Sequence, residues 1–187
     1  MATRTSGDGR LTVDDWVEAG YAVLAEEGLN ALKIDRLCER LGVTKGSFYW
    51  HFADMGAYRN ALIESWAQLR DEDRRHIEQL RDMPPRERMS VMMTSLVRPR
   101  QWALERAMRE WARSDGTVAA AVRSADHRLL KAVQQAFCDY GFDADEASLR
   151  AMTFFTAGIG LLHISGPIPQ KQSAPQRDRF LDFMLRP

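Results

Sequence analysis

Apolar residues recur every three or four positions along most of the 187-residue chain, which is the spacing of one side of an α-helix. Almost no segment shows the alternating polar and apolar residues of a half-buried strand. Glycine and proline interrupt the pattern at points that end or begin segments of helical length. The sequence therefore predicts an all-α fold of about nine helices.

The ends of the expected helices follow from capping residues and helix breakers. Thr12, Thr44 and Asp54 are placed to cap helices, and Gly28 and Gly42 are placed to end them. Paired prolines at 84–85 interrupt the pattern again, because proline is tolerated only at a helix start. The helices are expected at about 13–27, 34–41, 45–52, 55–83, 85–97, 101–114, 117–140, 143–164 and 177–185.

Charge is balanced over the whole chain, with 26 basic and 26 acidic residues, so net charge favours no class of partner. The local balance is different. Residues 33–52 hold two acidic side chains, one histidine and four basic side chains, the last being Lys33, Arg36, Arg40 and Lys45. This segment could form a weakly basic surface.

Two features bear on the cellular location. Cys38 and Cys138 are far apart, and the first ten residues hold no hydrophobic export segment, so we interpret both as thiols in a reducing compartment. The longest apolar run, at 154–164, is shorter than the roughly 20 residues that a membrane-spanning helix needs. We expect a cytoplasmic protein without a membrane partner.

The stretch LGVTKGSFYWHF, residues 41–52, places a tight glycine turn between two short helices. Such a helix-turn-helix can lay its second helix in the major groove of DNA. Phe48 and Phe52 share one side of that helix and are the expected core anchors, whereas Tyr49 and His51 occupy other sides. In the alternative interpretation every aromatic residue here is core, since such helix pairs occur in many all-α proteins.

The side chains left outside carry donors that suit a DNA duplex. Hydroxyl, phenol, imidazole and helix N-terminal amide groups donate to phosphate, and a lysine in the first turn can reach base edges. A glycine lets the backbone approach the groove closely, and two cations of the preceding helix could hold an adjacent phosphate. The predicted DNA-binding residues are Lys33, Arg36, Thr44, Lys45, Gly46, Ser47, Tyr49, Trp50 and His51.

From residue 13 to about residue 66 the chain resembles the tetracycline-repressor (TetR) family of bacterial transcription regulators. The resemblance rests on the succession IDRLCERLGVTKGSFYWHF followed by a capped helix. The elements in register are Leu37-Cys38, Gly42-Val43, Thr44-Lys45-Gly46-Ser47 and Tyr49-x-His51-Phe52. The resemblance implies a helix-turn-helix DNA-binding domain at 10–54 and an effector-binding and dimerisation domain at 55–187.

The resemblance also implies roles for single residues. A small residue at Cys38 lets the recognition helix pack closely, Tyr49 and His51 contact the DNA backbone, and the early residues of the recognition helix read bases. Those early residues are Thr44, Lys45 and Ser47. Two positions depart from the family pattern: Met55 replaces a phosphate-contacting lysine, for which Arg59 could substitute, and Lys33 replaces a capping threonine.

A single recognition helix reads only a few base pairs, so useful specificity requires a dimer on a palindromic site. Small residues of the eighth helix and aromatic residues of the ninth are the candidates for that interface, and the resemblance implies a four-helix dimer bundle. The alternative is a core helix with unusual glycines. The predicted dimer residues are Thr156, Gly158, Gly160, Phe180 and Phe183.

By the same resemblance, helices four to seven enclose an effector pocket. Methionine and aromatic side chains make an adaptable apolar lining, although such residues at helical spacing are more often core. The predicted effector-binding residues are Trp66, Met92, Leu96, Trp102, Met108, Trp111 and Phe155.

These patterns together predict a ligand-responsive repressor that binds a palindromic DNA operator as a homodimer and is released by a small apolar or amphipathic effector. The alternative is a protein-interaction module that keeps the helix-turn-helix without reading DNA. No paired Glu-x-x-His motif, Ser-His-Asp set or glycine-rich phosphate loop is evident. We therefore expect no catalysis, no metal and no cofactor.

Overall fold

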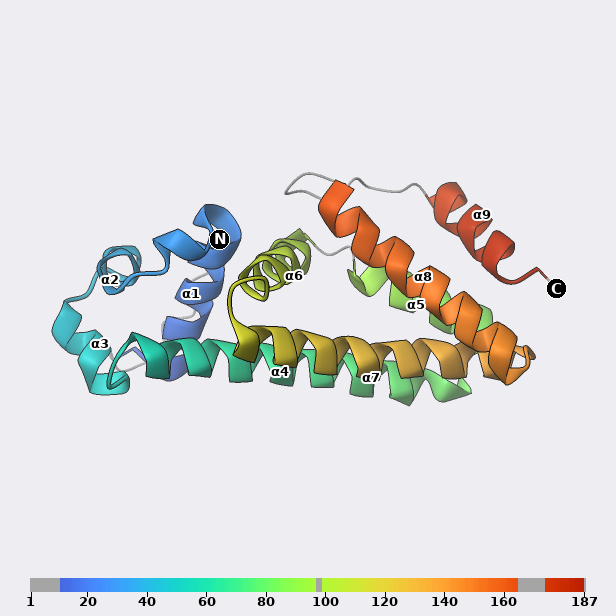
Figure 1. Ribbon diagram of the computed structural model, residues 1–187, viewed down its shortest axis with the longest axis horizontal. Helices are drawn as coiled ribbons and strands as arrows, with labels where there is room; N and C mark the ends of the chain where they lie inside the picture. The colour runs from blue at the N-terminus through green and yellow to red at the C-terminus, as the bar shows by residue number, and fades with distance from the viewer. Residues whose placement is uncertain (1–10, 97–98, 165–173, 187) are drawn as a thin grey trace. The chain divides into compact units, whose positions relative to one another are not determined.

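The computed structural model describes residues 11–96, 99–164 and 174–186, and every regular element in those ranges is helical. This confirms the predicted all-α fold (Figure 1). The helices are α1 (Val13–Glu27), η1 (Leu29–Ala31), α2 (Ile34–Leu41), α3 (Lys45–His51), α4 (Met55–Gln79), η2 (Leu80–Asp82), α5 (Pro85–Leu96), α6 (Pro99–Trp111), α7 (Gly116–Tyr140), α8 (Ala144–Ile164) and α9 (Ala174–Met184), where η marks a short 3-10 helix.

Local sequence explains most of the helix ends. The Thr12 hydroxyl accepts a hydrogen bond from the Asp15 amide while the Asp15 carboxylate accepts one from the Thr12 amide, which is the reciprocal capping box of a helix start. Asp54 caps α4 by accepting a hydrogen bond from the Ala57 amide at 2.8 Å. Gly42 ends α2 at a left-handed φ of 68°, which glycine adopts without a Cβ clash.

Some ends differ from the expectation. α6 begins at Pro99 rather than 101, because proline suits the first position of a helix. α9 begins at Ala174 rather than 177 and takes a proline into its first turn. Thr44 occupies the N-cap position of α3, as predicted, but its side chain makes no capping hydrogen bond.

The residues up to 65 form one compact unit. Trp16 of α1 is central to its core, and its ring meets the rings of Phe48 and Phe52 edge-on at 5.4 and 6.4 Å between centroids. Tyr58 of α4 is fully buried, and its hydroxyl donates to the Trp16 carbonyl oxygen at 2.8 Å. Tyr58 and Leu62 of α4 complete this core, so the compact unit includes the first turns of α4.

The residues from 66 onwards form the second compact unit. α7 and α8 form a helical hairpin that turns at Gly141, and α5 packs against both α7 and α9 (Figure 1). One cluster of buried apolar residues in this unit consists of Ile77, Met89, Met92, Val133, Ala136, Phe137, Ala147, Ala151, Phe154, Leu181, Met184 and Leu185.

α8 has two different sides. Its inner side packs into the core through Ala147, Ala151 and Phe154, whereas Leu149 and Met152 of its outer side are exposed. Among the described helices, α8 alone has the length and mean hydropathy, 1.3, that could suit a membrane span, and 22% of that window is buried. The apolar helix is therefore longer than the run at 154–164 indicates, and its outer side lacks a cover in the described part of the chain.

Candidate nucleic-acid interface and candidate ligand pocket

α2 and α3 form the predicted helix-turn-helix. The Val43 amide donates to the Cys38 carbonyl oxygen at 3.0 Å, which closes the turn around Gly42. Cys38 is buried, in keeping with the close packing expected of a small residue there. Phe48 and Phe52 are buried too, which confirms them as the anchors of α3.

The outer side of α3 presents aromatic side chains to solvent. Tyr49 is 56% exposed and Trp50 is 62% exposed. His51 is half-buried and meets the Trp50 ring edge-on at 4.6 Å between centroids. The four aromatic residues at 48–52 thus divide as predicted, with two in the core and two outside. Of the other predicted DNA-binding residues of this segment, Thr44, Lys45 and Gly46 are exposed and Ser47 is half-buried.

Lys45 is held by an acid of the preceding helix. Its ammonium group lies 2.5 Å from a carboxylate oxygen of Asp35, and both side chains are well exposed. The hydrogen bond to Asp35 raises the pKa of Lys45, so the amine remains charged. Lys45 would have to leave this carboxylate to reach a base.

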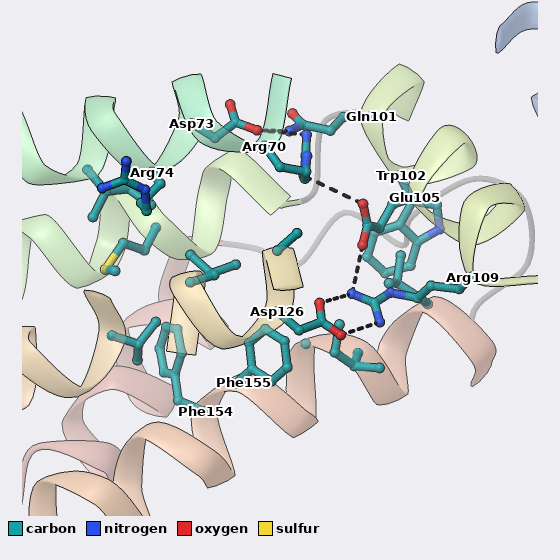
Figure 2. Close-up of a pocket in the computed structure, with 18 residues that line it drawn as sticks. Arg70, Asp73, Arg74, Gln101, Trp102, Glu105, Arg109, Asp126, Phe154 and Phe155 are labelled. Carbon is teal, nitrogen blue, oxygen red and sulfur yellow. Dashed lines mark hydrogen bonds and ion pairs between the residues drawn. The ribbon is translucent and has the colours of Figure 1, made fainter. Parts of the chain in front are cut away.

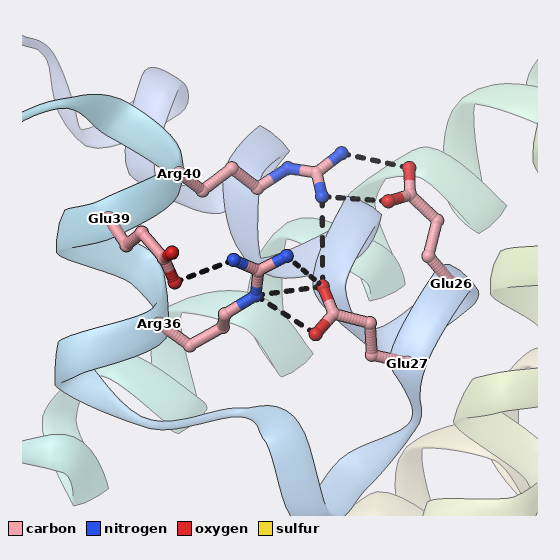
Figure 3. Close-up of polar contacts among 5 residues, drawn as sticks. All are labelled: Glu26, Glu27, Arg36, Glu39 and Arg40. Atoms are coloured by element: carbon pink, nitrogen blue, oxygen red, sulfur yellow. Dashed lines mark hydrogen bonds and ion pairs between the residues drawn. The ribbon is translucent and has the colours of Figure 1, made fainter.

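Arg36 and Arg40 join α2 to α1 through ion pairs (Figure 3). The Arg36 guanidinium binds Glu27 at 2.9 Å and Glu39 at 2.7 Å, and Arg40 binds Glu26 at 2.7 Å. Hydrogen bonds to Glu27 and Glu39 raise the pKa of Arg36. A phosphate would have to compete with these carboxylates for Arg36, so part of the weakly basic surface is neutralised within the protein.

Lys33 and Arg59 are the other cations near this surface. Lys33 occupies the N-cap position of α2 without a side-chain capping bond, and it is exposed. Met55 begins α4 and is half-buried, whereas Arg59, one turn later, is exposed. The structure thus leaves an exposed cation one turn after the position of the missing lysine.

The second compact unit contains a pocket of about 60 Å³ between α4, α5, α6, α7 and α8 (Figure 2). Most of its lining is apolar, namely Ile77, Met92, Trp102, Ala125, Leu129, Val133, Phe154, Phe155, Ile159 and Leu162.

A chain of charged side chains lines the rest of the pocket (Figure 2). Arg70 pairs with Asp73 at 2.7 Å and lies 3.6 Å from Glu105. Arg109 pairs with Glu105 at 2.7 Å and with Asp126 at 2.5 Å. Burial opposes the charge of Arg109, but the hydrogen bond to Asp126 and the nearby carboxylates raise its pKa overall. The pocket is therefore amphipathic.

The predicted effector-binding residues divide into three groups. Met92, Trp102 and Phe155 line the pocket. Trp66, Met108 and Trp111 are buried but are not part of its lining. The side chain of Leu96 lies outside the described residues.

The charged residues of the pocket were not predicted from the sequence. Glu105 is three residues after the buried Trp102, and Arg109 is four residues after Glu105, so all three fall on the inner side of α6. A charged pair in register with a buried tryptophan was the signal that could have found them.

The predicted dimer residues fall into two groups, one exposed to solvent and one facing the interior. Thr156 is exposed and Phe183 is 66% exposed, as an interface would require. Gly158 lines the pocket, Gly160 is half-buried, and Phe180 packs on Phe154 with 5.8 Å between the ring centroids. One side of α8 carries an exposed stripe, the outer stripe, which consists of Leu149, Met152, Thr153 and Thr156.

Comparisons with known proteins agree with this architecture. The model of the tetR family of bacterial regulatory proteins matches residues 17–61. The class A tetracycline repressor from transposon 1721 of Escherichia coli is 30% identical over 162 residues, 84% of this chain and 69% of that protein. The class C tetracycline repressor of E. coli is 29% identical over 156 residues, 78% of this chain and 63% of that protein. A transcriptional regulator from Rhodococcus sp. Rha1 has the same fold, with a TM-score of 0.75, 18% identity and 94% of both chains covered.

The family model and the related sequences match different lengths of this chain. The family model covers α2, α3 and parts of α1 and α4, which are the elements of the helix-turn-helix unit. The two tetracycline repressors extend the match into the second compact unit. This chain spans 63% of the length of the class C repressor and 69% of the class A repressor. Members of this family are transcriptional regulators and not enzymes. The chain belongs to the TetR family of bacterial regulatory proteins.

Proposed function

We propose that the protein is a transcriptional repressor that binds a palindromic DNA operator as a homodimer and is released by a small apolar or amphipathic effector. The observation that carries the proposal is the division of α3, in which Phe48 and Phe52 are buried while Tyr49 and Trp50 are exposed beside Lys45. Exposed phenol, indole and ammonium groups on a short helix suit contacts with phosphates and base edges. Membership of the TetR family supports the same function.

Release by an effector requires that operator and effector favour different conformations, so that each weakens the binding of the other by the same factor. α4 supplies Tyr58 and Leu62 to the core that holds α3, and Arg70 and Ile77 to the pocket. It is therefore the candidate element for transmitting the change.

The proposal is tested by selecting random DNA duplexes with the purified protein and titrating the enriched sequence at two salt concentrations. We expect a palindrome, and an affinity that falls steeply with salt because neutralised phosphates release counterions. Absence of an enriched sequence together with salt-insensitive binding would contradict the proposal.

Variants of α3 assign the contacts. Tyr49→Phe should weaken binding to operator and random DNA alike by about fivefold, the loss of roughly one hydrogen bond. Lys45→Ala should weaken binding and also reduce the preference for operator. Asp35→Asn is the matched control, because it frees Lys45 and removes a nearby acid, and it should tighten binding. If Lys45→Ala weakens the affinity for operator and for random DNA by the same factor, Lys45 does not read bases.

The outer stripe of α8 and the exposed Phe183 support the homodimer, because an uncovered apolar helix side commonly marks an interaction surface. Leu149→Arg should convert the dimer to a monomer at micromolar concentration, since the new charge would be buried without a partner. Ala120→Arg, at an exposed site on α7, is the control. Sedimentation velocity distinguishes the two states, and a Leu149→Arg protein that stays dimeric would exclude this stripe from the interface.

The second candidate function is a protein-interaction module that does not read DNA. The pairing of Arg36 and Arg40 with acids of α1 favours it, because those cations are less available to phosphate. The salt titration separates the two functions, since contacts with a protein partner need not share the steep salt dependence of phosphate contacts.

A further inference from the structure

A second hollow lies on the second compact unit between α4, η2, α5 and α7, with a volume of about 300 Å³. Glu78 is the one acid in its lining, and the remaining polar side chains include five cations. We call this hollow the basic cleft, after the cations Arg74, Arg81, Arg88, Arg128 and Lys131.

Nearby acids neutralise only part of the charge of the basic cleft. Three of its cations have partners: Arg74 with Glu78 at 2.6 Å, Arg88 with Asp139 at 2.5 Å and Arg128 with Asp71 at 2.9 Å. Arg81 and Lys131 are exposed and make no ion pair with any side chain that the structure describes. The cleft therefore carries two cations more than its acids balance.

Arg88 gives an independent indication of a ligand. Its side chain is only 3% exposed, and its terminal nitrogen Nη2 donates to Asp139. Its Nε atom is buried and has no hydrogen-bond acceptor among the described residues. A buried donor without an acceptor is unfavourable. The Nε atoms of Arg88 and Arg74, both in the cleft lining, would gain an acceptor if a side-chain rotation turned them toward an anion in the cleft.

The basic cleft adjoins the pocket of Figure 2. Arg74 and Ile77, three residues apart on α4, line both. The pocket volume of about 60 Å³ is several times the roughly 10–15 Å³ that one water molecule needs, so the pocket admits only a short apolar chain. A molecule with an acidic end and a short apolar tail would match the two spaces together.

We propose that the basic cleft binds the carboxylate or phosphate group of a small amphiphile whose short apolar tail enters the pocket past Ile77. This names the chemical class of the effector and so rests on the proposed function, although the binding itself requires no DNA. Guanidinium groups present paired donors that match the oxygens of carboxylate and phosphate. The two cations without an ion pair add attraction, Lys131 without a carboxylate to displace and Arg81 beside the charge of Asp139.

The probes are hexanoate and hexyl phosphate, compared with hexanol, acetate and hexylamine, in NMR titrations of the full chain without DNA. We expect at least one of the two acids to bind about tenfold or more tightly than hexanol, which lacks the charge, and than acetate, which lacks the tail. The stronger of the two acids identifies the head group. Hexanol, acetate or hexylamine binding as tightly as the better acid would overturn the proposal.

Paired variants locate the site. Arg81→Ala with Lys131→Ala should weaken binding of the better acid about tenfold, the loss of two exposed charge contacts. Arg75→Ala with Arg123→Ala removes two exposed cations from α4 and α7 outside the cleft lining, and should change the affinity less than twofold. If both double variants weaken binding of the better acid equally, the cations act by general charge attraction and the proposed site is wrong. If no probe binds, the effector class is wrong, while the operator selection still tests DNA binding separately.

Discussion

Replacing Gly20 by alanine is expected to destabilise the first compact unit by about 3 kcal/mol, because overpacking typically costs about 1–3 kcal/mol and a lost hydrogen bond adds about 1 kcal/mol. A Cβ atom at this position would lie 2.1 Å from the Tyr58 hydroxyl oxygen and 2.9 Å from Leu62 Cδ2. The phenol is hard to displace, since it is fully buried against Phe52 and bonded to the Trp16 carbonyl oxygen. Burial also raises the pKa of Tyr58, so its hydroxyl stays a donor.

Urea unfolding followed by tryptophan fluorescence measures this loss. Gly116→Ala is the control, because a Cβ there meets nothing within 4 Å and alanine favours the helix. Adding Tyr58→Phe to Gly20→Ala should recover part of the stability by removing the oxygen that clashes. Operator binding should fall with Gly20→Ala, since Trp16 and Tyr58 hold the anchors of α3. A Gly20→Ala protein as stable as Gly116→Ala would contradict the close approach of α1 to α4.

Replacing Arg109 by alanine is expected to destabilise the second compact unit by about 3 kcal/mol, near the lower end of the range for breaking a buried ion pair. Arg109 is 12% exposed and lies between Glu105, 9% exposed, and Asp126. Its removal leaves the carboxylates of Glu105 and Asp126 in the pocket wall without the cation that separates them. Among the described residues, Glu105 would retain one ion-pair partner, Arg70 at 3.6 Å.

Arg113→Ala is the matched control for Arg109→Ala. Arg113 also pairs with a nearby acid, Glu110 at 3.6 Å, but both side chains are well exposed. Its loss should change stability by less than about 0.5 kcal/mol, as for most exposed ion pairs. Adding Glu105→Gln to Arg109→Ala should recover part of the loss, because it removes a buried unbalanced charge. Equal midpoints of urea unfolding for Arg109→Ala and Arg113→Ala would show that this chain of charges contributes little.

Features that depend on neighbouring residues were predictable from the sequence. The cap at Thr12 and the turn at Gly42 need only groups within a few residues, and the spacing of Phe48 and Phe52 indicates one buried side of α3. The order of the helices and the division of the aromatic residues in the helix-turn-helix follow from the same local rules.

Features that depend on distant residues were not predictable. The sequence places Arg36 among the predicted DNA-binding residues, but it does not show that Glu27, from another helix, lies 2.9 Å from it. Trp102 and Trp111 of α6 are both buried, yet only Trp102 lines the pocket. Periodicity identifies the inner side of a helix, but it does not say whether a neighbouring helix fills the space beside it.

The sequence by itself therefore determined the helices, most of their ends and the pattern that marks the recognition helix, because hydrogen bonds within a helix and its caps join residues close together in the chain. Only the tertiary structure decided which arginines are neutralised, which apolar residues enclose a pocket and where the basic cleft lies. Those features bring together side chains of different helices: α1 and α2 at the neutralised arginines, α4 to α8 around the pocket, and α4, η2, α5 and α7 around the basic cleft. Their distances depend on how whole helices pack, and no local spacing encodes that packing.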